Sequence, residues 1–200
     1  MLGPFETTIK GVVNLAWPMI IISIVIIVSF RFCYLVKNKE KIILHKELLA
    51  LSFIIYILCL FQVVSFQDGA SWASNNFIPF KEILRYDITS RLFLKNVVGN
   101  MILFLPFGFF VSHYLKAEKI HIPILLTLIA SISIETVQMS IGRVFDVDDI
   151  ILNLLGGILG FALYWILSKF LKKLPEFCRR DWFLNIISIL VLVGLIVVLV

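Results

Sequence analysis

The chain has 200 residues, of which 60% are hydrophobic and only 16% are charged, and its mean hydropathy is +1.03. A soluble domain usually carries about a quarter charged residues, so this composition excludes an ordinary soluble domain. The formal net charge of +5 arises from 18 basic and 13 acidic residues. Because the basic residues form no single basic face, we expect no nucleic-acid partner.

Six apolar stretches are long enough to cross a membrane as helices, which takes roughly 18 or more apolar residues. They are Val12–Phe30, Leu48–Phe66, Val97–Leu115, Ile122–Ile141, Ile150–Ser168 and Phe183–Val200. We therefore predict an all-α fold, a polytopic transmembrane bundle of about six helices. The first apolar stretch is too long for a signal peptide, so we expect it to be retained.

The basic residues predict how the helices are oriented, because short loops rich in Lys and Arg stay in the cytoplasm. Arg31–Glu47, the loop after Leu115 and Lys169–Asp181 contain five, two and five basic residues, and they are alternate connections. We therefore expect a multi-pass protein of the cell membrane with both termini outside the cytoplasm. The long outer loop Gln67–Asn96 contains four basic residues, which weakens the asymmetry.

The three cysteines include no CxxC motif, and one of them lies within an apolar stretch. We therefore predict neither a disulfide framework nor a bound cofactor. Asp146, Asp148 and Asp149 carry the oxygen ligands that hard cations prefer, but they lack the spacing of a calcium loop. No metal site is predicted.

The outer loop Gln67–Asn96 is amphipathic in its second half. Its apolar residues recur at helical spacing, with charged residues between them. These apolar residues are Phe80, Ile83, Leu84, Ile88 and Leu92. We expect an interfacial helix here, with Pro79 in its first turn, lying along the outer membrane surface or over the mouth of the bundle. A plain interfacial linker is the alternative.

The fourth apolar stretch contains a carboxylate well inside the membrane. Ser131, Glu135 and Gln138 are spaced by four and three residues, which places them on one stripe of a helix. Burying a carboxylate at this depth costs free energy unless it is paired, protonated or hydrated. For that reason we consider Glu135 a candidate functional residue.

The fifth apolar stretch carries a second polar face. Asp149, Asn153, Gly156 and Gly160 are spaced by four, three and four residues and share one side of a helix. The acidic end is favoured by the helix dipole, and the two glycines permit close helix packing. Asn100 in the third stretch lies at the same predicted level of the membrane.

We refer to seven of these residues, all expected in the outer half of the membrane, as the polar cluster. It consists of Asn100, Glu135, Gln138, Arg143, Asp146, Asp149 and Asn153. Two interpretations remain open. In one, Arg143 neutralises a carboxylate and the cluster is structural. In the other, the cluster is a pocket that binds a ligand, with Glu135 and Asp149 as candidate catalytic residues.

At these residues the chain resembles the VanZ-like family, named for a teicoplanin-resistance protein. The similarity is carried by four blocks in order. They are Asn76-x-Ile78-Pro79-Phe80, Asn100-x-x-Leu103-Phe104-x-Pro106-Phe107-Gly108, Glu135-x-x-Gln138 and Arg143-x-x-Asp146-x-x-Asp149-x-x-x-Asn153-x-x-Gly156. The resemblance implies a bacterial integral membrane protein and a VanZ-like four-helix core at residues 48–170. Residues 1–47 and 171–200 would each add one helix and a basic loop. Some family members are associated with glycopeptide or lipoglycopeptide resistance.

Three functions are compatible with these residues. The first is a non-catalytic envelope protein that binds a lipid, a lipid-linked cell-wall precursor or a glycopeptide antibiotic at the outer leaflet. The second is an intramembrane enzyme that acts on such a lipid through Glu135 and Asp149. The third is a small transporter or flippase, for which the chain is short unless it forms a homo-oligomer.

Overall fold

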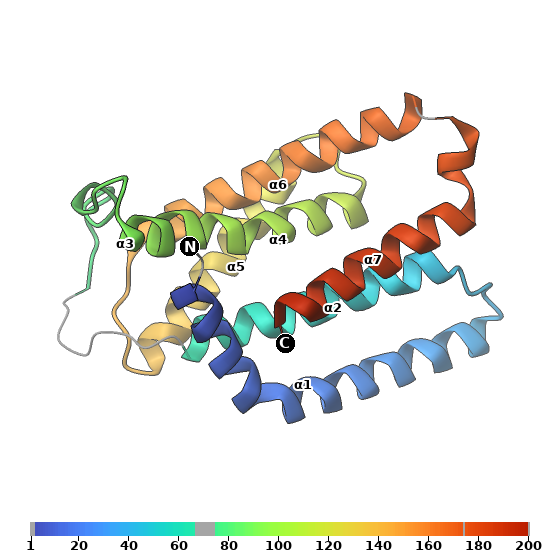
Figure 1. Ribbon diagram of the computed structural model, residues 1–200, viewed down its shortest axis with the longest axis horizontal. Helices are drawn as coiled ribbons and strands as arrows, with labels where there is room; N and C mark the ends of the chain where they lie inside the picture. The colour runs from blue at the N-terminus through green and yellow to red at the C-terminus, as the bar shows by residue number, and fades with distance from the viewer. Residues whose placement is uncertain (1–2, 67–74, 174, 200) are drawn as a thin grey trace. The chain divides into compact units, whose positions relative to one another are not determined.

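A computed structural model describes residues 3–66, 75–173 and 175–199, which are almost entirely helical (Figure 1). The chain divides into two compact units. The first, here called the terminal unit, comprises Met1–Gln67 and Lys173–Val200. The second, here called the central unit, comprises Asp68–Lys172.

The terminal unit contains three long helices and a short connecting turn. They are α1 (Gly3–Asn38), α2 (Leu44–Phe66), the 3-10 turn η3 (Glu176–Arg179) and α7 (Asp181–Leu199). Pro18 lies inside α1, whose ribbon bends in its first half (Figure 1), as expected where proline removes a backbone hydrogen bond. Ile20 of α1 and Ile55 and Cys59 of α2 form a buried core against apolar side chains of α7.

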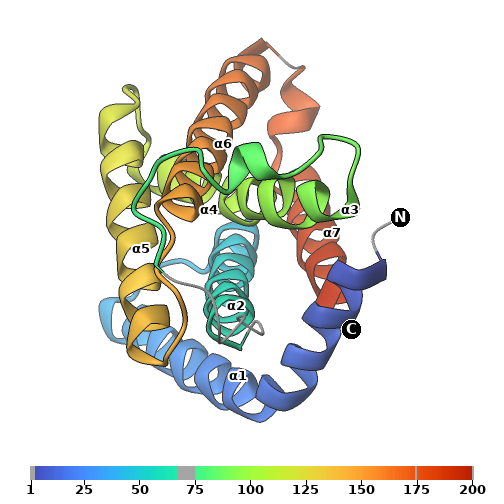
Figure 2. The same cartoon turned by 90° about the vertical axis from the view of Figure 1, so that its left-hand side faces the viewer.

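The central unit begins with a segment that has little regular structure and continues with three long helical runs. The first run joins α3 (Arg91–Phe93), the π-helical turn η2 (Leu94–Val98) and α4 (Gly99–Leu115) without a break. The other two are α5 (His121–Ser140) and α6 (Val147–Lys173). Figure 2 shows the α5–α6 connection beside the irregular segment that precedes α3, near the N-terminal end of α4.

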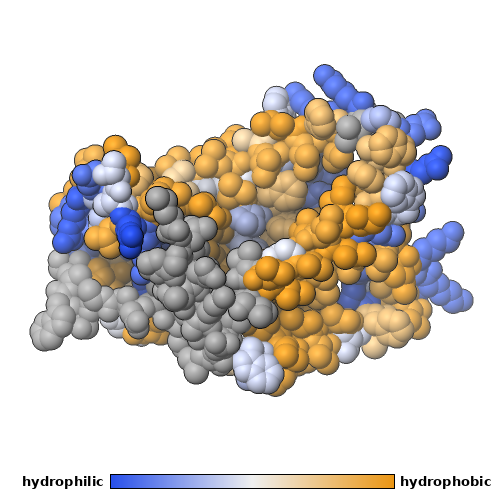
Figure 3. Space-filling model, in the orientation of Figure 1, coloured by the Kyte–Doolittle hydropathy of each residue, from blue (hydrophilic) through white to orange (hydrophobic). Residues whose placement is uncertain are grey.

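Five helices are long and apolar enough to cross a membrane, as the sequence predicts for a polytopic helical protein. These spans are Trp17–Asn38, Leu44–Gln62, Arg91–Leu115, His121–Ser140 and Val147–Leu171. The sixth predicted span forms α7, which is apolar over Asp181–Val197 but shorter than the other five. In Figure 3 the sides of the helices are mostly hydrophobic, while hydrophilic side chains gather near their ends.

The expected amphipathic helix over Phe80–Leu92 is not formed. Between residues 75 and 90 the structure has only the 3-10 turn η1 (Ile83–Arg85), and residues 67–74 lie outside the described residues. The physical reason is that acidic side chains bind the backbone N–H groups of this segment, and Phe80 adopts a left-handed φ of 65°. The apolar side chains nevertheless remain on the surface: Leu84 is 81% exposed and Ile88 is 75% exposed.

Candidate functional site

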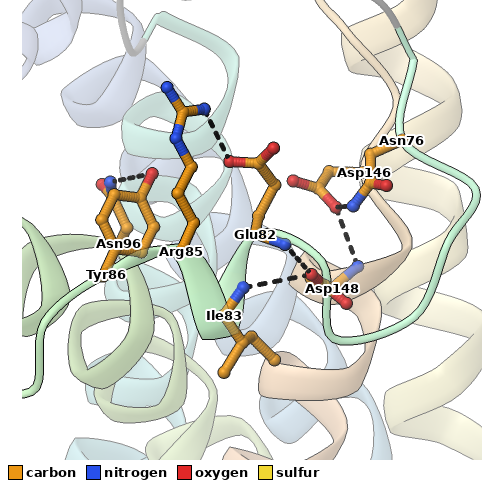
Figure 4. Close-up of polar contacts among 8 residues, drawn as sticks. All are labelled: Asn76, Glu82, Ile83, Arg85, Tyr86, Asn96, Asp146 and Asp148. Carbon is orange, nitrogen blue, oxygen red and sulfur yellow. Dashed lines mark hydrogen bonds and ion pairs between the residues drawn. The ribbon is translucent and has the colours of Figure 1, made fainter.

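The polar cluster lies where residues 75–90 of the central unit meet the connection between α5 and α6. These residues are here called the outer segment, because they belong to the loop that the sequence predicts to lie outside the cytoplasm. Asn76 and Asp146 form a short parallel bridge. The Asn76 N–H donates to the Phe145 carbonyl over 2.8 Å, and the Val147 N–H donates to the Asn76 carbonyl over 3.0 Å. The Asn76 side chain is 4% exposed and donates to the Asp146 carboxylate over 2.8 Å. The outer segment is therefore fixed to the start of α6 through both backbone and side chain (Figure 4).

Asp148 is the strongest anchor of this region, although sequence analysis assigned it no role beyond a possible cation ligand. Its side chain is 1% exposed and lies in the first turn of α6. One carboxylate oxygen accepts hydrogen bonds from the N–H groups of Glu82 and Ile83 over 2.7 and 3.2 Å (Figure 4). The other oxygen accepts from the Phe80 N–H. Asp148 thus organises the outer segment instead of facing a ligand.

Glu135 is buried at the C-terminal end of α5, with 1% of its surface exposed. Its carboxylate accepts a hydrogen bond from the Asp146 N–H over 3.0 Å. This bond connects the intramembrane carboxylate of α5 directly to the connection that precedes α6. A buried carboxylate that accepts a backbone N–H offsets part of the free-energy cost of its burial.

Two further contacts join the helices of the central unit across the cluster. Asn100 of α4 donates from its amide to the Asp149 carboxylate of α6. Asn153 of α6 donates to the Ser131 hydroxyl of α5 over 2.9 Å, and both side chains are buried. The predicted polar faces of these helices therefore meet each other within the central unit.

Gln138 and Arg143 complete the cluster at the turn after α5. The Gln138 carbonyl accepts the Arg143 backbone N–H over 2.9 Å, and the Gln138 side chain is 5% exposed. Gly142 between them has a φ of +83°, which glycine adopts without strain. Arg143 is the one basic residue between Ser140 and Val147, and it lies in the same connection as Asp146, whose N–H binds Glu135. The turn therefore brings its only cation to the carboxylates of α5 and α6.

The glycines of α6 let backbones approach closely. A Cβ placed on Gly160 or Gly156 would overlap backbone carbonyl oxygens of α4, those of Leu105 and Met101 respectively. A Cβ on Gly108 of α4 would in turn overlap the backbone of Gly157, and one on Gly157 would meet Thr127 of α5. Because no side chain separates the backbones at these points, the three helices lie near enough for their short polar side chains to form hydrogen bonds with one another.

The electrostatics of the site are dominated by carboxyl groups. Among the described residues, Arg143 accompanies the carboxyls of Glu135, Asp146, Asp148 and Asp149. Burial raises the pKa of Asp146, and the hydrogen bonds that it accepts from Asn76 and from the Asp148 N–H oppose that shift. No group of three or more His, Cys, Asp or Glu side chains in the described part of the chain is arranged to hold a metal ion.

The structure thus places all seven residues of the polar cluster around one end of the central unit. Sequence analysis missed the anchoring role of Asp148 and the part that Asn76 plays in the site. The sequence does contain a signal for Asp148. Three aspartates lie at the start of one helix, which is more than are needed to cap its N-terminus. A contact between residues some 70 positions apart has no such local signal, as with Asn76 and Asp146.

These features define an all-helical, multi-pass membrane protein with a buried polar cluster at the ends of its helices. The VanZ/LLP1 family matches residues 53–168, which is more than half of the 200-residue chain. The chain belongs to the VanZ/LLP1 family.

Individual known proteins give a consistent result. Protein VanZ from Enterococcus faecium is 30% identical to the chain over 105 residues, which cover 52% of this chain and 62% of that protein. The similarity therefore spans less than two thirds of the relative's length. No solved structure matches the chain.

Proposed function

We propose that this VanZ-like protein is a non-catalytic component of the bacterial cell envelope that contributes to glycopeptide resistance. In this proposal the polar cluster binds the polar part of an amphipathic ligand at the outer leaflet, with both chain termini on the outer side. The ligand is a membrane lipid, a lipid-linked cell-wall precursor or a lipophilic glycopeptide. The single observation that carries the proposal is the burial of Glu135, Gln138 and Asn153 among membrane-spanning helices.

Burial supports a binding role because polar side chains inside a bilayer raise the free energy of the protein. Apolar residues would pack the same helices at a lower free-energy cost. Structural contacts account for part of the cluster, since Asp148 and Asn76 anchor the outer segment. Glu135 accepts the backbone N–H of Asp146, and a carboxylate can accept several hydrogen bonds. In this proposal a donor of the ligand binds the same carboxylate.

The composition of the cluster indicates which ligand groups it would bind. Carboxylates accept hydrogen bonds from hydroxyl, amide and ammonium groups, whereas the Arg143 guanidinium donates to phosphate or carboxylate groups. The cluster contains three carboxyls, those of Glu135, Asp146 and Asp149, and one guanidinium. A head group that carries several donors and one anionic group would satisfy both kinds of side chain.

The proposal is tested by teicoplanin susceptibility in a sensitive Gram-positive host that expresses the full chain. We would compare wild type with Glu135→Gln, Arg143→Ala and Asp149→Asn. Glu118→Gln is the matched control, since this exposed carboxyl lies outside the cluster between α4 and α5. Membrane abundance and thermal stability of each variant are measured in parallel.

We expect wild type and the control to protect the host and the three cluster variants to lose protection at equal abundance. Protection that persists in all three variants would contradict a binding role for the cluster. Absence of protection by wild type would contradict the link to teicoplanin and leave binding of envelope lipids to be measured directly.

An intramembrane enzyme is the second candidate, and one observation favours it. Glu135 of α5 accepts the N–H of Asp146, which lies three residues before Asp149 of α6, so both carboxyls lie at the connection between these helices and one ligand could contact both. One such carboxyl could act as a general acid and the other as a general base. An enzyme would lose turnover in Asp149→Asn while it retained bound ligand, whereas a binding protein would lose affinity.

A further inference from the structure

A second candidate site lies in the terminal unit, whereas the polar cluster belongs to the central unit. A cavity of about 210 Å³ is formed between α1 and α2. Its apolar walls include Ile27, Val28, Leu35, Leu48, Leu51 and Ile54. Pockets for compact small molecules usually measure about 300–1,000 Å³, so this smaller cavity suits a stretch of hydrocarbon chain.

Arg31 of α1 and Glu47 of α2 are the two charged residues in the lining of this cavity. The guanidinium Nε and Nη2 donate to the two carboxylate oxygens of Glu47, each over 2.9 Å. The Arg31 guanidinium also lies 5.5 Å from the centre of the Tyr34 ring. These contacts fix its orientation but use only two of its five N–H donors. Within the described residues, Nη1 of Arg31 has no protein hydrogen-bond partner.

The charge of the segment that contains these two residues is positive. The segment Arg31–Glu47 contains five Lys or Arg residues and two Glu residues, which gives a net charge of +3 with His45 neutral. Segments of this kind next to a membrane helix attract anionic lipids. An apolar cavity with an oriented guanidinium in its lining is complementary to a lipid with an anionic phosphate.

From this complementarity we propose that the cavity between α1 and α2 binds an acyl chain of an anionic phospholipid whose phosphate contacts Arg31. Glu47 acts as a positioning residue, because its bidentate pair turns the free Nη1 edge of the guanidinium toward the phosphate. The lysines that flank the cavity in sequence add long-range attraction. The site is independent of the polar cluster, and of whether that cluster binds a ligand.

Native mass spectrometry of the full chain in detergent tests the proposal. Phosphatidylglycerol and phosphatidylcholine with identical acyl chains are added separately, and retained lipid is counted. Both lipids carry a phosphate, but the choline ammonium neutralises it in phosphatidylcholine and would be repelled by the basic segment. We therefore expect wild type to prefer phosphatidylglycerol by roughly tenfold.

Two variants separate the head-group contact from the acyl-chain contact. The double variant Arg31→Gln/Glu47→Gln keeps a neutral amide pair and should lose the tenfold preference. Ala50→Phe places a ring in the cavity, which Ala50 lines, and should reduce retention of both lipids. Lys119→Gln, in the turn between α4 and α5, is the control for lost positive charge and should behave like wild type.

Three outcomes would overturn the proposal. These are equal retention of the two lipids by wild type, a preserved preference in the double variant, and unchanged retention by Ala50→Phe. Circular dichroism of each variant confirms that its helices are formed before its lipid binding is compared. If the double variant does not fold, Ala50→Phe and the wild-type preference still decide the question.

Discussion

In the central unit the helices meet through backbone atoms and polar side chains, whereas in the terminal unit they meet through apolar side chains. Glycines bring α4, α5 and α6 together, and hydrogen bonds such as that from Asn153 to Ser131 cross between them. In the terminal unit the buried core consists of Ile20, Ile55 and Cys59, with leucines of α7 packed against it.

The difference shows what each kind of contact specifies. Apolar packing between membrane helices gains little over packing against lipid, so it tolerates many arrangements. A short polar side chain forms its hydrogen bond only in one helix register, and a glycine contact exists only at one crossing point. The central unit is therefore expected to respond sharply to single substitutions, and the terminal unit weakly.

Matched glycines in the two units give the largest expected difference. A Cβ on Gly160 of α6 would overlap the Leu105 carbonyl and lie 2.6 Å from the Phe109 backbone nitrogen. Backbone cannot move aside as a side chain does, so we expect Gly160→Ala to cost about 3 kcal/mol. This would lower the midpoint of thermal unfolding in detergent by about 6–12 °C.

Gly194 of α7 is the control, because an added Cβ there meets no atom within 4 Å. Alanine favours a helix over glycine by about 1 kcal/mol, so Gly194→Ala should leave the midpoint unchanged or raise it slightly. Equal destabilisation by the two substitutions would break the comparison between the units.

Matched aspartates at helix starts give the next largest difference. Asp148 and Asp181 both lie in the first turn of a helix, but Asp148 is 1% exposed whereas the Asp181 side chain is 84% exposed. Asp148→Ala removes the acceptor of three backbone N–H groups, and we expect a cost of about 2 kcal/mol. Asp181→Ala should cost about 0.5 kcal/mol, the value of a charge near a helix end.

Hydrogen exchange distinguishes the anchoring role of Asp148 from a general loss of stability. In Asp148→Ala we expect the amides of Phe80, Glu82 and Ile83 to exchange faster, while those in the middle of α2 keep wild-type rates. Unchanged exchange at the three amides would show that the outer segment is held by other contacts.

The helices of this protein could be predicted from its sequence, because hydrophobic length alone decides whether a segment spans a membrane. The helical spacing of Ser131, Glu135 and Gln138 likewise predicts that they share a stripe, and the structure buries all three. The sixth apolar stretch, Phe183–Val200, likewise forms a helix, α7 (Asp181–Leu199).

The outer segment could not be predicted from local pattern. The spacing of Phe80, Ile83 and Leu84 is helical, but the Asp148 carboxylate binds N–H groups that a helix would have used. That carboxylate lies 66 positions from Glu82 in the sequence. A tertiary contact of this kind overrides local periodicity and leaves no trace in a window of neighbouring residues.

The pH dependence of stability sharpens the comparison within the central unit. Burial raises the pKa of Asp146, whereas hydrogen bonds from the Thr89 N–H and hydroxyl lower the pKa of Asp87. The stability contributed by Asp146 is therefore fully present below its unfolded pKa of about 3.8 and is lost as pH rises through its raised folded value. The contribution of Asp87 has the opposite sign and is lost as pH falls through its lowered folded value.

Thermal unfolding of wild type, Asp146→Asn and Asp87→Asn between pH 3 and pH 7 measures how the stability contributed by each aspartate changes with pH. Relative to wild type, Asp146→Asn should gain stability as pH rises from about 4, seen as a rise of its unfolding midpoint over that of wild type. Asp87→Asn should instead gain relative to wild type as pH falls. Parallel curves for the two variants would indicate that burial does not control Asp146.

The smallest expected effect concerns one ion pair in each unit. Arg85 donates to Glu82 over 3.1 Å, and its side chain is 70% exposed, so Arg85→Gln should cost at most about 0.5 kcal/mol and less at high salt. Arg31 instead joins α1 to α2 through two hydrogen bonds, and Arg31→Gln should cost about 1 kcal/mol. Unfolding midpoints at low and high salt measure both.

For these two substitutions the larger destabilisation is expected in the terminal unit, because the ion pair that joins two helices, Arg31–Glu47, belongs to that unit. If Arg85→Gln were the more destabilising change, the ion pair on η1 would hold the outer segment alongside Asp148. If Arg31→Gln had no effect, α1 and α2 would be held by apolar packing alone. The Arg31–Glu47 pair would then orient a guanidinium for a ligand without stabilising the helices that carry it.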